Sequence, residues 1–523
     1  MSDALSRTME IRKHVVETDR GVVASQHRQA AEAGAEVLRA GGDAVDAAVA
    51  CAFVCGVLEP WMSGPAGGGA AMHWRADTGE AHALNFGMQA PAKLRVEDFP
   101  LSGEGAASDL FPWERVVEDR NIFGAKAVAV PAMVDGLEAA HKRWGKLPWG
   151  ELLAPAIAHA RRGMGIDWYA SLIIAGAARD LARDADAAAM FLDEGQWPRA
   201  FSWTNAAEDR IDQGRMADSL DILAREGAAA LHGGDLGAAM AADIQGKGGY
   251  LTREDLAANR AQFHAPLAVP YRDAQLYAMP GLTAGPTMAS AFAHLAAQDL
   301  GSVDAAYPAY AKALRAAYAE RISSMGDDGE SPGAPGCTTH FSVVDRDGNM
   351  VSNTQTLLSI FGARMVSEST GLLMNNGIMW FDPEQGKPNS LGAGKRCLMN
   401  VCPMLGQADG KRFALGASGG RKIVSAVTQL ASFIVDFDMD LPAAFHQPRL
   451  DLSGGDQILA DAALAPGVIA KLEQIAPVSE VFRSLLPYPF ACPAGVLDTG
   501  AKRSGATEIM SAWGDAVAEP AGA

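Results

Sequence analysis

Long hydrophobic runs are absent from this chain of 523 residues. No apolar stretch approaches the roughly 18 to 20 residues that a membrane-spanning helix needs. Hydrophobic residues still make up 49% of the chain and charged residues 20%, which is ordinary for a globular protein with a sizeable core. We therefore expect a soluble, folded protein that does not have a membrane as its partner.

Cysteine and basic residues are also scarce. The six cysteines are too few for a disulfide framework at this length. Lys and Arg number 44 against 62 Asp and Glu, a formal net charge of −18, which argues against nucleic acid or an anionic membrane surface as the main partner. The first ten residues carry acids and lack the continuous apolar stretch of a secretory signal. Together these features indicate a cytoplasmic location.

Motifs for metals and nucleotides are missing too. The eleven histidines are scattered, and none occurs as His-Glu-x-x-His. Cys397 and Cys402 lack the spacing of a Cys-x-x-Cys pair. Residues 392–396 resemble a phosphate-binding loop only superficially, because Asn389 stands where its first glycine belongs and Arg396 replaces its Ser or Thr. We therefore expect no cofactor and no metal.

Two kinds of sequence follow each other along the chain. The first two-thirds is mainly helical in pattern, because apolar and alanine residues recur with helical spacing. The expected helices are Arg28 to Ala40, Ala44 to Val57, Pro131 to Arg162, Trp168 to Ala187 and Ser219 to Gln245, and strands are expected at Ala70 to Trp74 and Gly79 to Asn85. The glycines and prolines of Asp327 to Gly336 form the clearest break, after which β-type sequence begins. The tail beyond Trp513 is expected to be loose.

A β-hairpin is predicted directly after this break. Residues 338–344 and 350–356 have strand character on either side of a turn that contains Asp347-Gly348. With the turn centred on Asp347, antiparallel pairing sets Thr338 opposite Thr356, with Cβ atoms about 5 Å apart.

Thr338 stands where a self-generated nucleophile would be needed. If the backbone were cut before it, the new α-amino group, with a pKa of about 8, could act as base for the threonine's own hydroxyl. One residue would then supply both nucleophile and base. By pattern alone, the simpler interpretation is favoured, namely that Thr338 merely begins a strand after a loop.

Several short motifs change that balance, because they occur together and in order. They are Gly41 to Ala48, Gly67 to Gly69, Gly145 to Trp149, Leu251 to Leu256, Thr338 to Asp345, Gly394 to Arg396 and Gly416 to Gly420. On these motifs, the region from Val22 to Asp451 resembles the gamma-glutamyltranspeptidase family of N-terminal nucleophile hydrolases.

The resemblance implies an α+β fold, the four-layered αββα sandwich, made as a proenzyme that cleaves itself between Cys337 and Thr338. The products would be a large subunit, residues 1–337, and a small subunit, residues 338–523, that stay in one globular fold and could dimerise further. By the same match, Thr356 orients and polarises the nucleophile. Gly419 and Gly420 would donate backbone N–H groups to the tetrahedral oxyanion, each worth about 3 to 4 kcal/mol. The alternative for these two glycines is an ordinary tight turn.

The sequence departs from the family at the residues that hold a glutamyl group. The arginine that clamps the substrate's α-carboxylate falls on Gly87. The other polar positions fall on Leu358, Gly377, Trp380, Met399 and Asn400. A charged amino-acid head buried there without partners would cost several kcal/mol. We therefore expect an amidohydrolase or acyltransferase with a less polar acyl group, although Trp380 and Met399 could equally be plain core residues.

Other interpretations stay open at this point. A true γ-glutamyl hydrolase or transpeptidase acting on glutathione-like substrates is one, and an uncleaved, catalytically silent relative that only binds a ligand is another. Hydrolysis is favoured over transfer because water is always available as acceptor. Arg396 could face an anionic part of a small-molecule amide substrate, but a structural ion pair is the favoured role.

Overall fold

Two seven-stranded antiparallel sheets form the centre of the computed structural model, which describes residues 11–107, 113–199, 209–325 and 337–521. The first sheet runs in the order β1 (Val16–Thr18), β22 (Arg503–Thr507), β21 (Cys492–Asp498), β17 (Lys411–Ser418), β16 (Met404–Ala408), β13 (Ala274–Ala278) and β12 (Leu267–Tyr271). The second runs in the order β11 (Gln262–His264), β4 (Glu80–Phe86), β3 (Gly68–Arg75), β15 (Met350–Leu358), β14 (Cys337–Val344), β2 (Val22–Ser25) and β23 (Asp515–Ala518).

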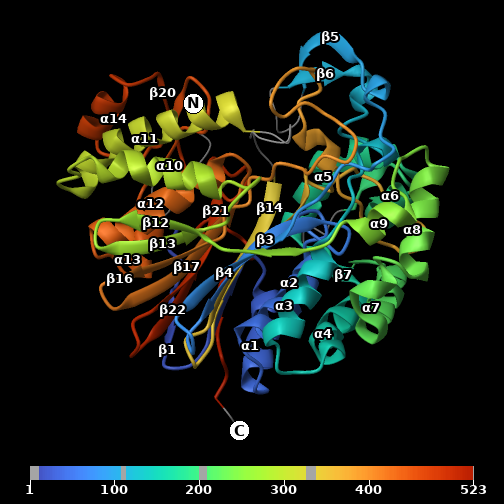
Figure 1. Ribbon diagram of the computed structural model, residues 1–523, viewed down its shortest axis with the longest axis horizontal. Helices are drawn as coiled ribbons and strands as arrows, with labels where there is room; N and C mark the ends of the chain where they lie inside the picture. Colours follow the sequence, from blue (N-terminus) through green and yellow to red (C-terminus); the bar gives the residue numbers. More distant parts are fainter. Residues whose placement is uncertain (1–10, 108–112, 200–208, 326–336, 522–523) are drawn as a thin grey trace.

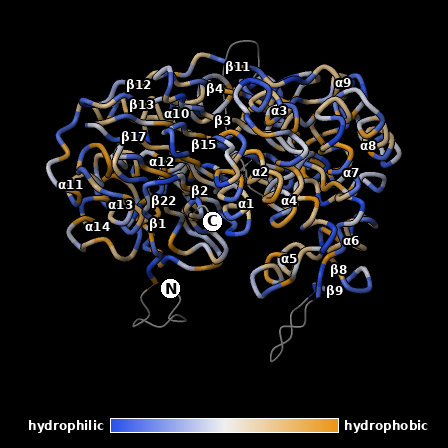
Figure 2. Tube along the Cα trace, turned by 90° about the horizontal axis from the view of Figure 1, so that it is seen from below, coloured by the Kyte–Doolittle hydropathy of each residue, from blue (hydrophilic) through white to orange (hydrophobic). Residues whose placement is uncertain are grey.

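Helices cover the outer face of each sheet. On the second sheet these are α1 (Arg28–Arg39), α2 (Ala44–Leu58) and α3 (Met133–Trp144), and on the first they are α10 (Gly285–Ala296), α11 (Val303–Ser324), α12 (Lys422–Asp436) and α13 (Leu441–His446). Figure 1 shows the two helical groups on opposite sides of the strands, and the perpendicular view in Figure 2 shows the same separation. The predicted four-layered αββα fold is therefore confirmed.

Further helices and short strands complete the structure around these layers. They are α4 (Trp149–Arg162), α5 (Trp168–Leu181), α6 (Ala185–Phe191), α7 (Gly214–Glu226), α8 (Asp235–Gly246), α9 (Arg253–Ala258), α14 (Pro466–Leu472), β5 (Leu101–Ala106) with β6 (Glu114–Val116), and β18 (Leu450–Asp451) with β19 (Ile458–Asp461) and β20 (Val478–Val481). None of the helices in the described ranges combines the length and apolar character that crossing a bilayer requires.

Local chemistry explains most helix boundaries. The first two predicted helices are correct to within a residue, and the second begins with a capping box in which Asp43 and Asp46 accept from each other's backbone N–H. The helix predicted from Pro131 to Arg162 is two helices, α3 and α4, because Gly145 and Pro148 interrupt it. The helices predicted at 168–187 and 219–245 are likewise divided, into α5 and α6 and into α7 and α8.

The chain's end is not loose, so that prediction is wrong. Residues Asp515–Ala518 form β23, which pairs with β2 at the edge of the second sheet. Glu519 is buried, and its side chain accepts a hydrogen bond from the backbone N–H of Gly21 at 3.1 Å. This pairing joins residues almost 500 positions apart and leaves no trace in local sequence. The predicted break at Asp327 to Gly336 lies outside the described residues.

The two sheets approach each other closely where β14 crosses β17. The His340 ring of β14 lies against Gly416 of β17, where an added Cβ would be 2.3 Å from the ring carbon Cε1. Nδ1 of His340 is 2.8 Å from Oγ1 of Thr354, and Nε2 is 3.0 Å from Oγ of Ser342. Burial lowers the pKa of His340 to about 3, so the ring is neutral. Only glycine at position 416 allows this contact.

We predict that Gly416→Ala lowers the free energy of unfolding by about 1 to 3 kcal/mol, because the new methyl group overlaps the His340 ring and forces the sheets apart. Urea denaturation followed by circular dichroism measures this. Gly176→Ala is the matched control, because Gly176 lies in α5 with no atom within 4 Å of an added Cβ, and alanine there should stabilise by about 0.5 to 1 kcal/mol. Equal effects of the two substitutions would contradict the interpretation.

Candidate active site

The predicted hairpin exists, and its register is confirmed over most of its length. Residues Thr339 to Val344 pair with Gln355 to Met350, as the turn at Asp347-Gly348 requires. At the strand end the pairing shifts, because Cys337 pairs with Leu358 and a bulge intervenes. Thr338 therefore faces Thr356 and Leu357 together, and the predicted direct pairing of Thr338 with Thr356 is wrong by this one irregularity. The two threonines remain neighbours on adjacent strands, and both are buried.

Leu358 accounts for the bulge. It has a φ of +84°, which is unusual for a residue with a branched side chain. Its backbone N–H donates to the Oγ1 of Thr356 at 2.7 Å, which bends β15 away from regular pairing. Strained backbone of this kind is concentrated at functional sites. The predicted substrate-binding residue Leu358 thus shapes the strand on which Thr356 lies.

The glycine run Gly67 to Gly69 lies on the other side of Thr356. Thr356 pairs with Gly68, and an added Cβ at Gly67 would lie 2.3 Å from the carbonyl oxygen of Thr356. These glycines therefore permit close packing of backbone on backbone around the second threonine.

Gly419 and Gly420 form the turn between β17 and α12. Their φ angles are +130° and +64°, in the region that favours glycine. An added Cβ at Gly419 would lie 2.8 Å from the Cα of Ala491. Within the described part of the chain, neither of their N–H groups donates a hydrogen bond. They lie at the amino end of α12, where the helix dipole favours negative charge. Gly419 and Gly420 therefore do form a tight turn, as the alternative interpretation expects. The same turn also presents two backbone N–H donors.

Gln26, at the end of β2, connects β14 to the glycine turn. Its Nε2 donates to Oγ of Ser418 at 2.6 Å and to the carbonyl oxygen of Cys492 at 2.7 Å, and its Oε1 accepts from Oγ1 of Thr339 at 3.0 Å. Thr339 directly follows Thr338, and Ser418 directly precedes Gly419. Two contacts, the His340 ring over Gly416 and the Gln26 bridge from Thr339 to Ser418, therefore place the beginning of β14 near the end of β17.

Sequence reasoning missed Gln26, and also Glu59, whose Oε2 lies 3.4 Å from Oγ1 of Thr339. Both side chains are almost completely buried. The available signal for Glu59 was an acid directly after α2, a helix whose fifteen residues are all buried. Gln26 offered no local signal, since its partners lie hundreds of positions away in sequence.

Among the residues that the structure describes, Gly87 is the one predicted substrate-binding residue that lines a cavity of about 320 Å³. The lining of this cavity also includes Asn85, His264 and Arg396. An added Cβ at Gly87 would lie 2.7 Å from the terminal methyl group of Met399. The space that a longer residue at 87 would need is therefore filled by Met399.

Leu358, Trp380 and Met399 are fully buried in one hydrophobic cluster behind this cavity. Gly377 packs beside it, since its added Cβ would lie 2.7 Å from the Cβ of Ala129. Trp380 Nε1 has no hydrogen-bond partner within the described residues. The plain-core alternative therefore describes the packing of Trp380 and Met399, and Met399 also limits the cavity at Gly87.

Asn400 faces a buried cation. Its Oδ1 accepts from Nη2 of Arg321 at 2.9 Å, and Nη1 of Arg321 donates to Thr283 O at 3.0 Å and to Thr287 Oγ1 at 2.9 Å. Arg321 is fully buried, and desolvation lowers its pKa to about 10, so it stays charged. Arg396 contacts Oδ1 of Asn259 at 3.5 Å at the cavity wall.

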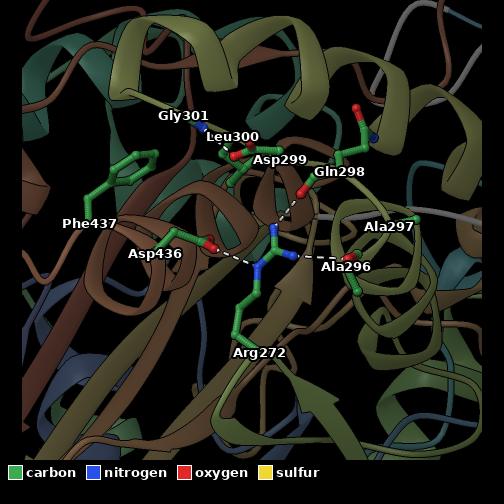
Figure 3. A pocket seen from close by; sticks show the side chains of 9 residues that line it. All are labelled: Arg272, Ala296, Ala297, Gln298, Asp299, Leu300, Gly301, Asp436 and Phe437. Carbon is green, nitrogen blue, oxygen red and sulfur yellow. Dashed lines mark hydrogen bonds and ion pairs between the residues drawn. The ribbon is translucent and has the colours of Figure 1, made fainter.

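A second, larger hollow has no connection with these residues. Figure 3 shows it beside the ends of α10 and α12. Arg272 crosses it and donates to Asp436 at 3.0 Å, to the Ala296 carbonyl at 2.9 Å and to the Gln298 carbonyl at 2.7 Å. The guanidinium of Arg272 therefore joins the end of α12 to the end of α10 and the residues that follow it. Across the described ranges, no three His, Cys, Asp or Glu side chains gather as metal ligands would.

Known proteins resemble this chain over most of its length. The family model described as "Gamma-glutamyltranspeptidase" matches residues 30–335 and 330–477. Acylase ACY 1 proenzyme from a Pseudomonas species is 34% identical over 496 residues, covering 86% of this chain and 86% of that protein. Glutathione hydrolase proenzyme from Pseudomonas aeruginosa is 31% identical over 498 residues, covering 85% of each chain.

Solved structures agree on the fold. Cephalosporin acylase from Bacillus halodurans superposes with a TM-score of 0.85 and covers 99% of both chains at 24% sequence identity.

We predict that Gln26→Leu destabilises the protein by about 1 to 3 kcal/mol, because Thr339, Ser418 and the Cys492 carbonyl lose a buried partner. Urea denaturation gives the change in free energy of unfolding. Gln385→Leu is the control, since exposed Gln385 makes one hydrogen bond, to the Leu391 carbonyl, and should change stability by at most about 0.5 kcal/mol. Comparable losses in both variants would show that Gln26 does not join the two sheets.

Proposed function

This chain belongs to the gamma-glutamyltranspeptidase family, and we propose that it is a self-processing amidohydrolase whose acyl group is not γ-glutamyl. The observation that carries the proposal is the arrangement around Gln26. One amide joins the residue after Thr338 to the residue before Gly419, so a nucleophile candidate and a pair of N–H donors come from opposite sheets to one place.

Self-cleavage would begin at the bulge. The Oγ1 of Thr338 attacks the carbonyl carbon of Cys337, the peptide C–N bond breaks, and the nitrogen takes the hydroxyl proton to become the α-amino group of Thr338. Water then hydrolyses the resulting ester and leaves a carboxylate on Cys337. Both sheets contain strands from before and after residue 337, which would hold the two products together as large and small subunits of one fold.

Turnover would use the same hydroxyl. The free amine of Thr338 accepts its proton, and the oxygen attacks the amide carbonyl of a small substrate while Thr356 orients the hydroxyl. The N–H groups of Gly419 and Gly420 stabilise the oxyanion, and the α-ammonium group of Thr338 returns the proton to the substrate nitrogen as the C–N bond breaks and the amine leaves. Water then attacks the acyl-threonine, gives one proton through the Thr338 amine to the threonine oxygen, and releases the acid. Apart from the hydrolytic water, every group that moves a proton in this scheme is supplied by the chain itself.

The acyl pocket supports a substrate other than a glutamyl amide. Gly87 replaces the cation that would pair with an α-carboxylate, and Met399 occupies the volume beside it. Leu358 and Trp380 stand at positions where the family resemblance expects polar residues, but both are buried in the hydrophobic cluster and bring no polar group to the cavity. Burying a charged amino-acid head without partners would cost several kcal/mol. The similarity to an acylase proenzyme agrees with this choice. The cytoplasmic location stays a prediction.

We predict that the purified protein separates into two fragments that meet at Cys337 and Thr338, and that Thr338→Ala remains one chain. Without the hydroxyl, the variant has no atom to attack the Cys337 carbonyl. Intact mass spectrometry measures both. A full-length wild-type mass that persists on incubation would favour the silent ligand-binding alternative.

We predict that cleaved enzyme hydrolyses hexanoyl para-nitroanilide at least about tenfold faster, in kcat/KM, than γ-glutamyl para-nitroanilide, because the glutamyl head loses its ion pairs. The double variant Gly87→Arg with Met399→Ser should raise γ-glutamyl turnover by roughly 10- to 100-fold, since serine makes room for the arginine.

Met399→Ser alone serves as control, because it opens the space without adding the cation. Wild-type enzyme that turns over both anilides equally well would refute the assignment of the acyl group and favour the glutathione-like alternative.

A further inference from the structure

Glu59 is a buried carboxyl group beside the proposed nucleophile. It ends α2, and its backbone N–H donates to the Cys55 carbonyl at 2.8 Å. Its side chain has no ion-pair partner among the residues that the structure describes, and it contacts Oγ1 of Thr339. An acid in such a place either leaves a costly charge unpaired or keeps its proton.

The direction of the hydrogen bonds decides between these two states. The Cys492 carbonyl can only accept, so the group of Gln26 that faces it must be the NH₂, and the Gln26 oxygen must face Thr339. Oγ1 of Thr339 lies 3.0 Å from the Gln26 oxygen and 3.4 Å from Oε2 of Glu59, and its one proton can serve only one of these acceptors. With that proton given to the nearer oxygen of Gln26, a hydrogen bond between Thr339 and Glu59 requires Glu59 to be the donor.

We propose that Glu59 is a positioning residue that acts as a neutral acid, donating through Thr339 and Gln26 to Ser418 and so holding Thr338 against the glycine turn. The inference rests on the proposed function for its effect on catalysis, whereas the proton on Glu59 is inferred from its burial together with the donor and acceptor roles of Gln26 and Thr339. The chain of bonds spans both sheets, from the end of α2 to the residue before Gly419.

The electrostatic surroundings support a retained proton. Burial is the main cause that raises the pKa of Glu59 well above its usual range, followed by Cys55 of the same helix, and the contact with Thr339 opposes this rise only in part. The groups of other elements that face it are Tyr169 of α5, Tyr488, and Cys492 of β21, all of them acids. Ionisation at high pH would force Thr339 to donate to Glu59 and release Gln26.

The test compares Glu59→Gln, which keeps a neutral donor of the same shape, with Glu59→Ala, which removes it. Self-cleavage is followed by intact mass, and cleaved enzyme is assayed with hexanoyl para-nitroanilide from acid to alkaline pH. We expect Glu59→Gln to retain kcat within about threefold and to lose the alkaline decline of the wild type. Glu59→Ala should lower kcat by about 10- to 100-fold with little change in KM, because the nucleophile is misplaced.

The pH dependence of stability tests whether Glu59 is protonated, and this measurement does not require an active enzyme. The folded pKa of Glu59 lies above the unfolded value of about 4.3, so the unfolded chain ionises first as pH rises, and stability falls from there until the folded pKa is reached. Thermal unfolding should therefore show Glu59→Gln gaining stability over wild type from about pH 5 upward. The control is Asp345→Asn, a buried acid at the opposite end of β14 that accepts from the N–H groups of Asp347 and Asn349. It should lose stability and leave the pH profile of kcat unchanged.

These measurements separate the two hypotheses. Wild-type enzyme that neither cleaves nor hydrolyses refutes the proposed function, and the stability comparison still decides the state of Glu59. Glu59→Gln as inactive as Glu59→Ala, a fully active Glu59→Ala, or no stability gain in Glu59→Gln overturns the inference. If Glu59→Ala does not fold, Thr339→Val and Thr339→Ser replace it, and only valine should lower kcat.

Discussion

The contact of β14 with β17 is the constraint on which the rest of the site depends. The candidate nucleophile belongs to one sheet and the N–H donors belong to the other, so their distance is set by how closely the sheets pack. The His340 ring fills the place of a side chain at Gly416, and Gln26 then fixes the strands along their length. A bulky side chain at position 416 would push the two sheets apart. It would thereby increase the distance between the candidate nucleophile on one sheet and the N–H donors on the other.

Sequence reasoning reached the features whose causes are local. The Asp347-Gly348 turn fixed the hairpin register over six pairs, and the capping box fixed the start of α2. It failed where distant chain segments decide the structure. The strand β23 forms because it pairs with β2 at the edge of the second sheet. The bulge at Leu358 depends on a left-handed backbone conformation, which a pattern of apolar residues does not predict. Gln26 joins residues 313 and 392 positions away, which no spacing argument could find.

The departures from the family at the glutamyl-binding positions are physically coupled. Loss of a long side chain at 87 leaves a space beside β4, and Met399 occupies it. With methionine at 399, any residue larger than glycine at 87 meets its terminal methyl group, so the Met399 side chain has to move when position 87 is enlarged. In the sequence, Gly87 and Met399 are two unrelated replacements of polar residues. In the structure the two positions share one space, so the specificity for the acyl group depends on both of them.

Two buried ionisable side chains, Arg321 and Glu59, lie near the site, and they differ in whether they carry a charge. Arg321 keeps its charge, because a guanidinium has several donors in fixed directions and the surrounding carbonyl, hydroxyl and amide oxygens can satisfy them. Glu59 has only acceptors when ionised and lies among groups that are themselves acids, so its lower-energy state is the protonated one. A carboxyl group that must keep its proton is worse for stability than an apolar residue of the same size. Its presence at the end of an entirely buried helix is therefore best explained by the direction that it gives to the hydrogen bonds of Thr339 and Gln26.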